Sequence, residues 1–312
     1  MFPRYTDAVT ASSQKNDPLQ REVRDDSISS AAPSALGVGM SPLLRKQGNM
    51  LAELRPLDSL LVAFSGGADS AYLAWAAHQA LGERALAVTA LSPSFSEHDR
   101  HESQRFAAAA GIRHECIETD EFSNPLYVAN SADRCYHCKD ELFEKLETLA
   151  RARGFAAIAY GINADDTHEF RPGHRAAAEH RILAPLLDAG LRKEEIRALS
   201  HLAGLTTWDR PAAACLSSRV AYGTAVTPEL LARIERGESF LRELGFRQFR
   251  LRVHGELARI EIASEELPRA LTGEMIQRMS AYLRELGFTY VTLDLEGYRT
   301  GSLNALIKKR SA

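Results

Sequence analysis

The sequence predicts an α/β protein with a doubly wound parallel sheet, followed by a small C-terminal α+β domain. Apolar runs of strand length alternate with longer helical segments over residues 59–203, and such alternation is typical of parallel strands joined by helical crossovers. The hexapeptide Leu-Arg-Glu-Leu-Gly-Phe then occurs twice, at 241–246 and 283–288, each time between an expected helix and an expected strand. We therefore expect an unstructured tail at 1–40, an α/β domain at 41–226 and a second domain at 227–312.

Each expected element follows from its local pattern. The continuous apolar runs predict strands that are buried on both faces, and glycines stop the helices that follow them. The expected strands are residues 59–64, 84–91, 113–119 and 156–160, and the expected helices are 69–81, 96–110, 140–153 and 193–203. Farther along, Gln248–Val253 and Ala258–Ala263 alternate apolar and charged residues, which predicts two half-buried antiparallel strands. Ligands of a doubly wound sheet bind at the carboxyl ends of its strands.

The composition narrows the class of protein. Apolar residues make up 45% and charged residues 25% of the 312 residues, which is ordinary for a globular protein. A formal net charge of -3 argues against a nucleic-acid partner and fits a small anionic substrate. No apolar stretch approaches the ~20 residues of a membrane-spanning helix, and the first residues lack the apolar core of a signal peptide. We therefore expect a cytoplasmic protein, with Met40 as the hypothetical start of its functional part.

A glycine-containing loop follows the first expected strand. Its sequence is Ser-Gly-Gly-Ala-Asp-Ser, from Ser65 to Ser70. Two glycines allow a sharp turn and a close approach to a ligand, and the following helix presents unpaired N–H groups and a positive dipole end to an anion. Ser65 and Ser70 add hydroxyl donors, and Asp69 either caps the helix or helps to place Mg²⁺. The alternative is a strand-to-helix turn without a ligand.

The chain has four cysteines, too few and too widely spread for a disulfide scaffold. Cys135 and Cys138 have the C-x-x-C spacing and stand before an expected helix. This spacing fits a structural zinc site, a redox dithiol or a cluster site completed by Cys215. Cys215 lies between Arg210 and Arg219, where a neighbouring cation favours the thiolate that attacks carbonyls and binds metals. Burial in the core is the alternative for Cys215 and our expectation for the strand residue Cys116.

Arginines line one side of the first C-terminal strand. Side chains alternate along a strand, so Arg250, Arg252 and His254 share one face, and the neighbouring strand adds Arg259 and Glu261. A solvated sheet face is the plainer interpretation. Two aligned arginines would nevertheless suit a phosphate.

Two of these segments resemble the PP-loop (N-type) ATP pyrophosphatases, whose fold is adenine nucleotide α-hydrolase-like. The loop Ser-Gly-Gly-x-Asp-Ser resembles the one that binds the pyrophosphate part of ATP, and Tyr160–Asp166 resembles a later segment of the nucleotide site. The alternative for the second segment is a strand end with a capped turn. The resemblance implies that Mg²⁺ neutralises the triphosphate. It assigns ATP binding to Ser65, Gly66, Gly67, Asp69, Ser70, Asn163 and Asp166.

Together the motifs resemble one family, the LarE-type sulfur transferases of nickel-pincer nucleotide cofactor biosynthesis, from about residue 40 to the end. The stretches that carry the resemblance are 65–70, 134–139, 160–166, 208–219, 251–261 and 294–302. It implies an enzyme that uses ATP to adenylate the carboxylates of pyridinium-3,5-biscarboxylic acid mononucleotide, releases pyrophosphate and converts them to thiocarboxylates. The partners it implies are the mononucleotide, further copies of this chain in a homo-oligomer, and other proteins of the same biosynthesis.

The resemblance also assigns the sulfur chemistry. In members with one such cysteine, the residue matching Cys215 attacks the adenylate, and cleavage of its Cβ–S bond leaves dehydroalanine. Members with three cysteines hold a 4Fe-4S cluster that supplies sulfide. This chain has the three-cysteine pattern, so we expect a cluster on Cys135, Cys138 and Cys215. Further residues assigned in this way are Arg219, Arg250 and Arg252 for phosphates and Glu261 for a metal in the C-terminal domain.

Rival functions share parts of this pattern. An amide-forming synthetase or a tRNA-thiolating enzyme would share the adenylation step, because a fold does not determine a function. The first would not need Cys215, and the second should carry a basic surface that the net charge does not support. A nucleotide-binding protein without catalysis and a scaffold with structural zinc are the rivals from another class.

Overall fold

The computed structural model describes residues 41–168, 172–211, 214–299 and 301–302. The tail predicted at 1–40, and with it the hypothetical start at Met40, lies outside these described residues.

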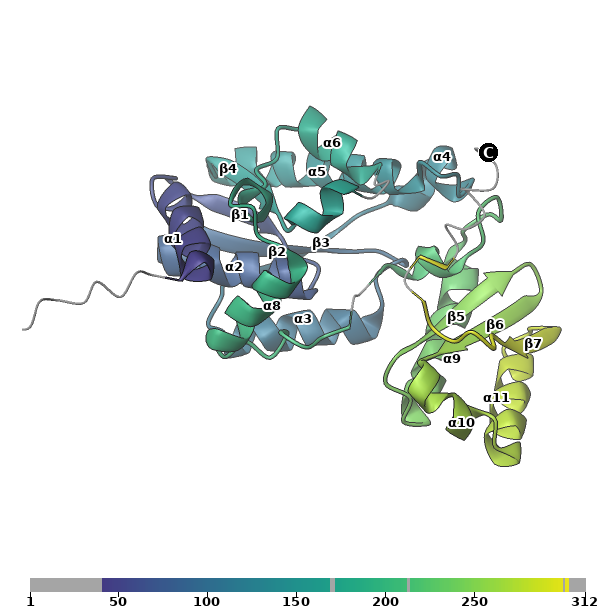
Figure 1. Ribbon diagram of the computed structural model, residues 1–312. Coiled ribbons are helices and arrows are strands. Elements are labelled where there is room, and N and C mark those ends of the chain that lie inside the picture. The colour runs from purple at the N-terminus through teal and green to yellow at the C-terminus, as the bar shows by residue number, and fades with distance from the viewer. Residues whose placement is uncertain (1–40, 169–171, 212–213, 300, 303–312) are drawn as a thin grey trace, which may run out of the picture. The chain divides into compact units, whose positions relative to one another are not determined.

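The first half of the described chain contains a four-stranded parallel sheet (Figure 1). Its order is β3-β2-β1-β4, with β1 at Leu60–Ala63, β2 at Ala85–Leu91, β3 at His114–Glu118 and β4 at Ala157–Tyr160. All three pairings are parallel. These strands lie where the apolar runs predict them, and their parallel pairing confirms that helices serve as the crossovers.

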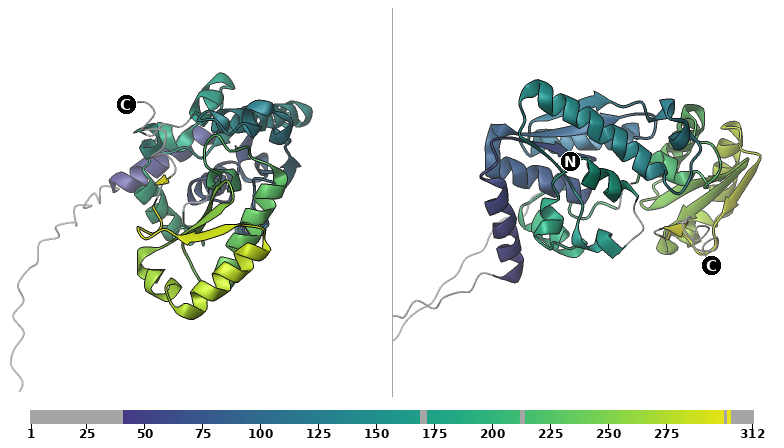
Figure 2. Two further views of the ribbon diagram at one scale, coloured as in Figure 1. Left: turned by 90° about the vertical axis from the view of Figure 1, so that its right-hand side faces the viewer. Right: turned by 90° about the horizontal axis from the view of Figure 1, so that it is seen from above.

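Helices cover both faces of this sheet, which confirms the doubly wound α/β class (Figures 1 and 2). Leu60 and Val62 of β1 face the core shared with α1, α2, α3 and α8, whereas Leu61 faces the core shared with α5 and α6. The bounds of these helices are Pro42–Leu54, Ala68–Leu81, Glu97–Ala109, Lys193–Leu202, Arg134–Arg153 and Gly173–Glu179, in the order named. Two-sided burial explains why β1 is apolar without alternation.

A second sheet of three strands follows. Strands β5 (Phe249–His254) and β6 (Leu257–Ile262) are antiparallel, as the alternating pattern predicts, and β7 (Tyr290–Leu293) runs parallel to β6. Helices α9 (Pro228–Glu243) and α11 (Gly273–Glu285) supply buried side chains to the core of this sheet. The remaining short helices are α4 (Pro125–Val128), α7 (Pro185–Asp188) and α10 (Leu267–Ala270).

The repeated hexapeptide has the same structural role twice. Its copies end α9 and α11 and lead into β5 and β7. Gly245 and Gly287 have φ angles of +83° and +88°, a left-handed conformation that glycine adopts without strain. Phe246 and Phe288, one residue later, are both buried in the second core. The repeat is therefore a helix-ending turn that returns an aromatic side chain to the core.

The domain boundary at 226/227 stays a prediction. Leu216 and Val220 precede this boundary but lie in the core of the second sheet, and Tyr127 joins the same core from α4. Segments on both sides of the boundary thus share one core. None of the helices in the described ranges is both long and apolar enough to cross a membrane.

Two local expectations were wrong. Helix α5 begins at Arg134 and not at Asp140, so the C-x-x-C segment forms its first turn instead of preceding it. Cysteine, tyrosine and histidine are poor helix formers, and tertiary packing overrides their weak propensity. Cys116 is half-buried and not a core residue, because β3 is an edge strand of the sheet.

A histidine clamp joins α5 to the end of α6 and should make stability depend on pH. The ring of His180 lies 3.1 Å from both Asp140 and Glu147. Burial lowers its pKa, but the two carboxylates outweigh this and raise the pKa above the ordinary 6.5. The stabilisation is therefore full below pH 6.5 and is lost as the pH rises through the raised pKa.

We expect His180→Gln to lower the urea midpoint more at pH 6 than at pH 9, because the charged ring of His180 stabilises the fold only at the lower pH. An equal loss at both pH values would contradict a role of the charged ring in stability.

Candidate active site

The glycine loop between β1 and α2 has the geometry of an anion site. Gly66 has a φ of +71°, which glycine tolerates best, and Gly67 is the N-cap of α2. Within the described ranges, no side chain caps this helix end, so its first N–H groups face outward. The loop is braced internally, because the N–H of Ser65 donates to Ser70 Oγ at 3.2 Å and that hydroxyl donates to Gly67 O at 3.1 Å.

The segment after β4 lies directly against this loop. A Cβ atom on Gly161 would lie 2.8 Å from the backbone nitrogen of Ser70, so only glycine fits there. The fully buried Asn163 donates from Nδ2 to Asp69 Oδ2 at 2.9 Å. The structure thus brings together the two segments that resemble a nucleotide site.

Two acidic side chains meet beside the loop. Burial raises the pKa of Asp69, the hydrogen bond from Asn163 opposes this, and the nearby charge of Asp166 raises it further. Asp166 is itself buried, and Lys193 Nζ lies 3.0 Å from its Oδ1. The repulsion that Asp166 exerts on Asp69 is of the kind that a bound cation relieves.

Arg210 connects the loop to α3. Its guanidinium donates to Gly66 O at 2.9 Å and to Asp99 Oδ1 at 2.7 Å. Arg197 in turn donates to the backbone oxygens of Trp208 and Arg210 at 2.7 and 2.6 Å. Arg210 could not be given this function from the sequence, because its partners lie 111 and 144 residues away along the chain.

The three cysteines of the predicted site act on one another electrostatically. Cys135 and Cys215 are exposed, and Cys138 is half-buried. Desolvation of the thiol raises the pKa of Cys135. The charge of Cys215 raises it further, and the charge of Arg134 opposes the rise. Burial raises the pKa of Cys138 well above 9.0, and Glu121 and Cys215 contribute. Among the described residues, no group of three His, Cys, Asp or Glu side chains is arranged to hold a single metal ion.

A buried arginine joins the start of α5 to the segment after Cys215. Arg134 Nη1 donates to Ser217 O at 2.9 Å and to Asn130 Oδ1. Tyr127 reinforces the link, because its hydroxyl lies 2.6 Å from Ser217 Oγ. The C-x-x-C turn and the Cys215 segment are thus fixed to each other by a buried cation.

The arginines predicted to bind phosphates have different surroundings. Arg219 is buried and forms two hydrogen bonds of 2.9 Å to the carboxylate of Glu238. Arg252 is buried against Glu261 at 3.0 Å. Arg250 donates to Phe249 O at 2.7 Å. Arg250 has further interactions within the chain as well.

The carboxylate of Glu261 accepts hydrogen bonds from three side chains of the protein. Its oxygens accept from Arg252 at 3.0 Å, from Arg259 at 2.9 Å and from Ser302 Oγ at 2.6 Å. Glu261 is fully buried. A metal ion at Glu261 would have to displace these donors. The assignment of Glu261 as a metal ligand stays a prediction.

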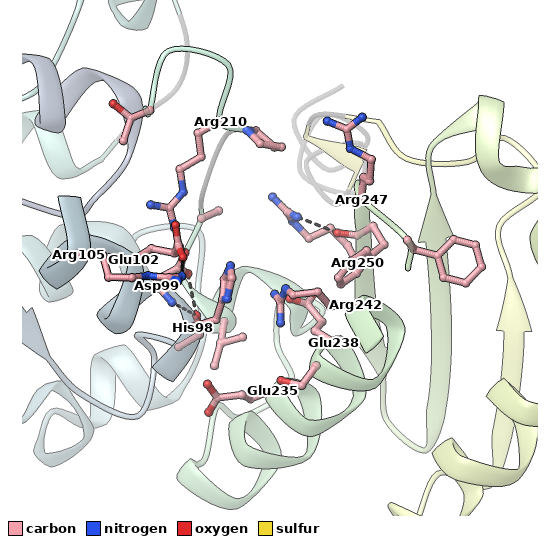
Figure 3. A pocket seen from close by; sticks show the side chains of 18 of the residues that line it. His98, Asp99, Glu102, Arg105, Arg210, Glu235, Glu238, Arg242, Arg247 and Arg250 are labelled. Carbon is pink, nitrogen blue, oxygen red and sulfur yellow. Dashed lines mark hydrogen bonds and ion pairs between the residues drawn. The ribbon is translucent and has the colours of Figure 1, made fainter. Parts of the chain in front are cut away.

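A cavity of about 850 Å³ lies beside Cys215 (Figure 3). One wall comes from α3, residues 206–211, Ala214 and Leu216, and the facing wall comes from α9 and the start of β5. Ala214 and Leu216, the neighbours of Cys215, both line it, as do Arg219 and Arg250. Its volume lies in the range of small-molecule sites.

These features define a class: an α/β protein with an uncapped helix end at a glycine loop, two neighbouring carboxylates and a ligand-sized cavity beside an exposed cysteine. No family model matches the chain. It is 34% identical over 274 residues to the pyridinium-3,5-bisthiocarboxylic acid mononucleotide synthase of Lactiplantibacillus plantarum, a match that covers 86% of this chain and 98% of that protein. The chain belongs to the family of this synthase.

Two uncharacterized proteins are similar over comparable lengths. One from Synechocystis is 43% identical over 253 residues, covering 81% of this chain and 94% of that protein. One from Methanocaldococcus jannaschii is 29% identical over 259 residues, covering 82% and 97%.

The close approach at Gly161 can be tested. Gly161→Ala places a methyl group against the Ser70 backbone, and we expect the free energy of unfolding to fall by about 1–3 kcal/mol, the usual cost of overpacking. ATP binding should weaken as the loop shifts. Gly273→Ala is the control, because nothing lies within 4 Å of a Cβ at that helical position. Equal urea midpoints and equal ATP affinities for both variants would refute this.

The buried link at Arg134 gives a second test. Arg134→Met leaves Ser217 O and Asn130 Oδ1 without their buried donor, and we expect the free energy of unfolding to fall by about 1–3 kcal/mol, the usual cost of an unsatisfied buried acceptor. Arg278→Met is the control, since Arg278 is an exposed helix residue paired only with Glu274 at 3.4 Å among the described contacts. Urea denaturation measures both; a loss below about 1 kcal/mol at Arg134 would mean that the link is not structural.

Proposed function

We infer that the protein is an ATP-dependent sulfurtransferase that converts the carboxylates of pyridinium-3,5-biscarboxylic acid mononucleotide to thiocarboxylates. The observation that carries this inference is the 34% identity to a bisthiocarboxylic acid mononucleotide synthase over nearly the whole of both chains. The glycine loop, the cysteines and the cavity beside them supply the binding groups that such a reaction needs.

The first half-reaction uses the loop at Ser65–Ser70. The N–H groups at the start of α2 would bind the β- and γ-phosphates of ATP. A carboxylate oxygen of the substrate attacks the α-phosphorus, the bond to the bridging oxygen breaks, and pyrophosphate leaves. The product is an acyl-adenylate, in which AMP is a good leaving group.

Magnesium fits at the paired carboxylates. Asp69 and Asp166 would hold it together with phosphate oxygens and water, which is how proteins bind Mg²⁺ beside nucleotides. This arrangement needs no third protein ligand. Bound there, Mg²⁺ would neutralise charge on the triphosphate during adenylation.

The second half-reaction delivers sulfur to the acyl carbon, and AMP departs with its bonding electron pair. The side chain of Cys215 is exposed, and both of its chain neighbours line the cavity. If the Cys215 thiolate itself attacks, a thioester forms, and removal of the α-proton with Cβ–S cleavage leaves the thiocarboxylate and dehydroalanine. That route consumes the protein after one turnover.

We propose instead that Cys135, Cys138 and Cys215 hold a 4Fe-4S cluster. The charge of Cys215 raises the pKa of both Cys135 and Cys138, so the three thiols lie near one another. A cluster binds each thiolate on a different iron, so the thiols need not converge on one ion. Such a group would supply a sulfide and leave the cysteine sulfurs intact. Arg134 would balance part of the thiolate charge, since its guanidinium interacts with Cys215 and Cys135.

From the family resemblance alone we further propose that the protein is a homo-oligomer that works with other proteins of nickel-pincer cofactor biosynthesis in the cytoplasm. Analytical ultracentrifugation would test the oligomer directly, and a monomer at micromolar concentration would contradict it.

A single turnover with ATP, Mg²⁺ and the mononucleotide separates the two sulfur routes. We expect pyrophosphate, AMP and a thiocarboxylate product, an unchanged mass at Cys215, and iron with acid-labile sulfide in protein purified without oxygen. Cys215→Ser should still release pyrophosphate but form no thiocarboxylate. Loss of one H₂S at Cys215 would refute the cluster route and support self-consumption, whereas absence of pyrophosphate release in the unaltered protein would refute the function itself.

A further inference from the structure

A buried carboxylate to which the proposed reaction assigns no role lies where β2 and β3 end. Glu121 is buried just beyond β3, at the edge of the sheet from which the phosphate loop also leaves. Three hydroxyl groups donate to its carboxylate: Ser92 Oγ at 2.6 Å, Ser94 Oγ at 2.7 Å and Thr119 Oγ1 at 3.0 Å. These hydrogen bonds offset the cost of burying the carboxylate, and they tie three segments of the chain to it.

The hydrogen bond to Ser94 matters because Ser94 also holds the cysteine segment. The carbonyl oxygen of Ser94 accepts the N–H of Leu216 at 2.8 Å, and Leu216 directly follows Cys215. Ser94 is itself buried, and its own N–H donates to Ser92 Oγ at 3.2 Å. Because the hydroxyl and the N–H of Ser94 are both held, its backbone is fixed with the carbonyl directed at Leu216. Glu121 thereby sets where the edge of the sheet contacts the Cys215 segment.

Glu121 also borders the C-x-x-C turn. It begins the short 3₁₀ helix Glu121–Ser123, which packs against α5. In this contact the carboxylate of Glu141, one helical turn after Cys138, accepts the N–H of Asp120. Burial raises the pKa of Cys138, and the charge of Glu121 raises it further. The carboxylate of Glu121 therefore lies near both segments that carry the cysteines of the proposed sulfur site.

We propose that Glu121 is a positioning residue for sulfur transfer, which acts through Ser94 to hold Cys215 at the acyl carbon that adenylation activates. This inference rests on the proposed function and adds a residue to its second half-reaction. It holds for either sulfur route, because Cys215 reacts itself in one route and holds the cluster in the other. A misplacement of about 1 Å at a reacting centre can lower a rate about a hundredfold, so a loosened anchor should slow sulfur transfer.

The acyl-adenylate has two fates, and their ratio reports on this role. Attack by sulfur displaces AMP and leaves the thiocarboxylate, whereas attack by water displaces AMP and returns the starting carboxylate. None of the hydrogen bonds described for the Glu121 carboxylate reaches the loop at Ser65–Ser70. A positioning role therefore predicts that pyrophosphate is still released in full while less thiocarboxylate forms.

A single turnover with ATP, Mg²⁺ and the pyridinium-3,5-biscarboxylic acid mononucleotide measures both products. We expect Glu121→Leu to lower the ratio of thiocarboxylate to pyrophosphate about ten- to a hundredfold. Ser94→Ala should lower the ratio less, because it removes one hydroxyl only. Glu121→Gln should restore the ratio, since its amide oxygen can accept from Ser92 and Ser94 and its amide nitrogen can donate to Thr119. A role of the negative charge would not give this rescue.

Glu118→Leu is the matched control, because Glu118 is the exposed last residue of β3. It should keep the ratio of the unaltered protein. The proposal is overturned if Ser94→Ala keeps that ratio too, if both products fall together in Ser94→Ala, or if Glu121→Gln behaves like Glu121→Leu. Ser94→Ala decides the matter if urea denaturation shows that Glu121→Leu does not fold. Absence of pyrophosphate release in the unaltered protein would instead overturn the proposed function, and this role with it.

Discussion

Burial of β1 on both faces positions the rest of the site. Leu60 and Val62 pack against one layer of helices and Leu61 against the other, and each such side chain contributes about 1.5–3 kcal/mol when fully buried. A strand held this firmly has its carboxyl end at a fixed place. Parallel pairing with β4 sets Ala63 opposite Tyr160, so the glycine loop and the segment containing Asn163 leave the same edge side by side.

The same edge receives the cysteine segment. Strand β2 ends next to β1, and just beyond it the carbonyl of Ser94 accepts the N–H of Leu216 at 2.8 Å. Cys215 is thereby placed at the edge where the phosphate loop begins, although 150 residues separate Cys215 from Ser65 in the sequence. The segments proposed for adenylation and for sulfur delivery therefore lie at the same edge of the sheet, because three strands end there together.

Buried charges then fix the segments to one another. Arg134 joins the C-x-x-C turn to Ser217, Arg219 joins the cysteine segment to α9 through Glu238, and Arg252 joins it to β6 by contacting both Ser218 O and Glu261. Such buried pairs add little net stability, because desolvation offsets the Coulomb attraction. Their effect here is geometric, since each is satisfied in one arrangement of the chain.

The sequence by itself determined most of the helices and strands. Apolar runs predicted β1 to β4, alternation predicted the antiparallel pair β5 and β6, and the spacing of Ser, Gly and Asp at 65–70 predicted an anion site, because each of these depends on neighbours along the chain. Only tertiary structure decided that α5 starts at Arg134, that Cys116 lies on an edge strand and which arginines face the cavity. Strand alternation tells which side an arginine is on. It does not tell whether a carboxylate such as Glu238 or Glu261 pairs with that arginine, because the carboxylate comes from another helix or strand.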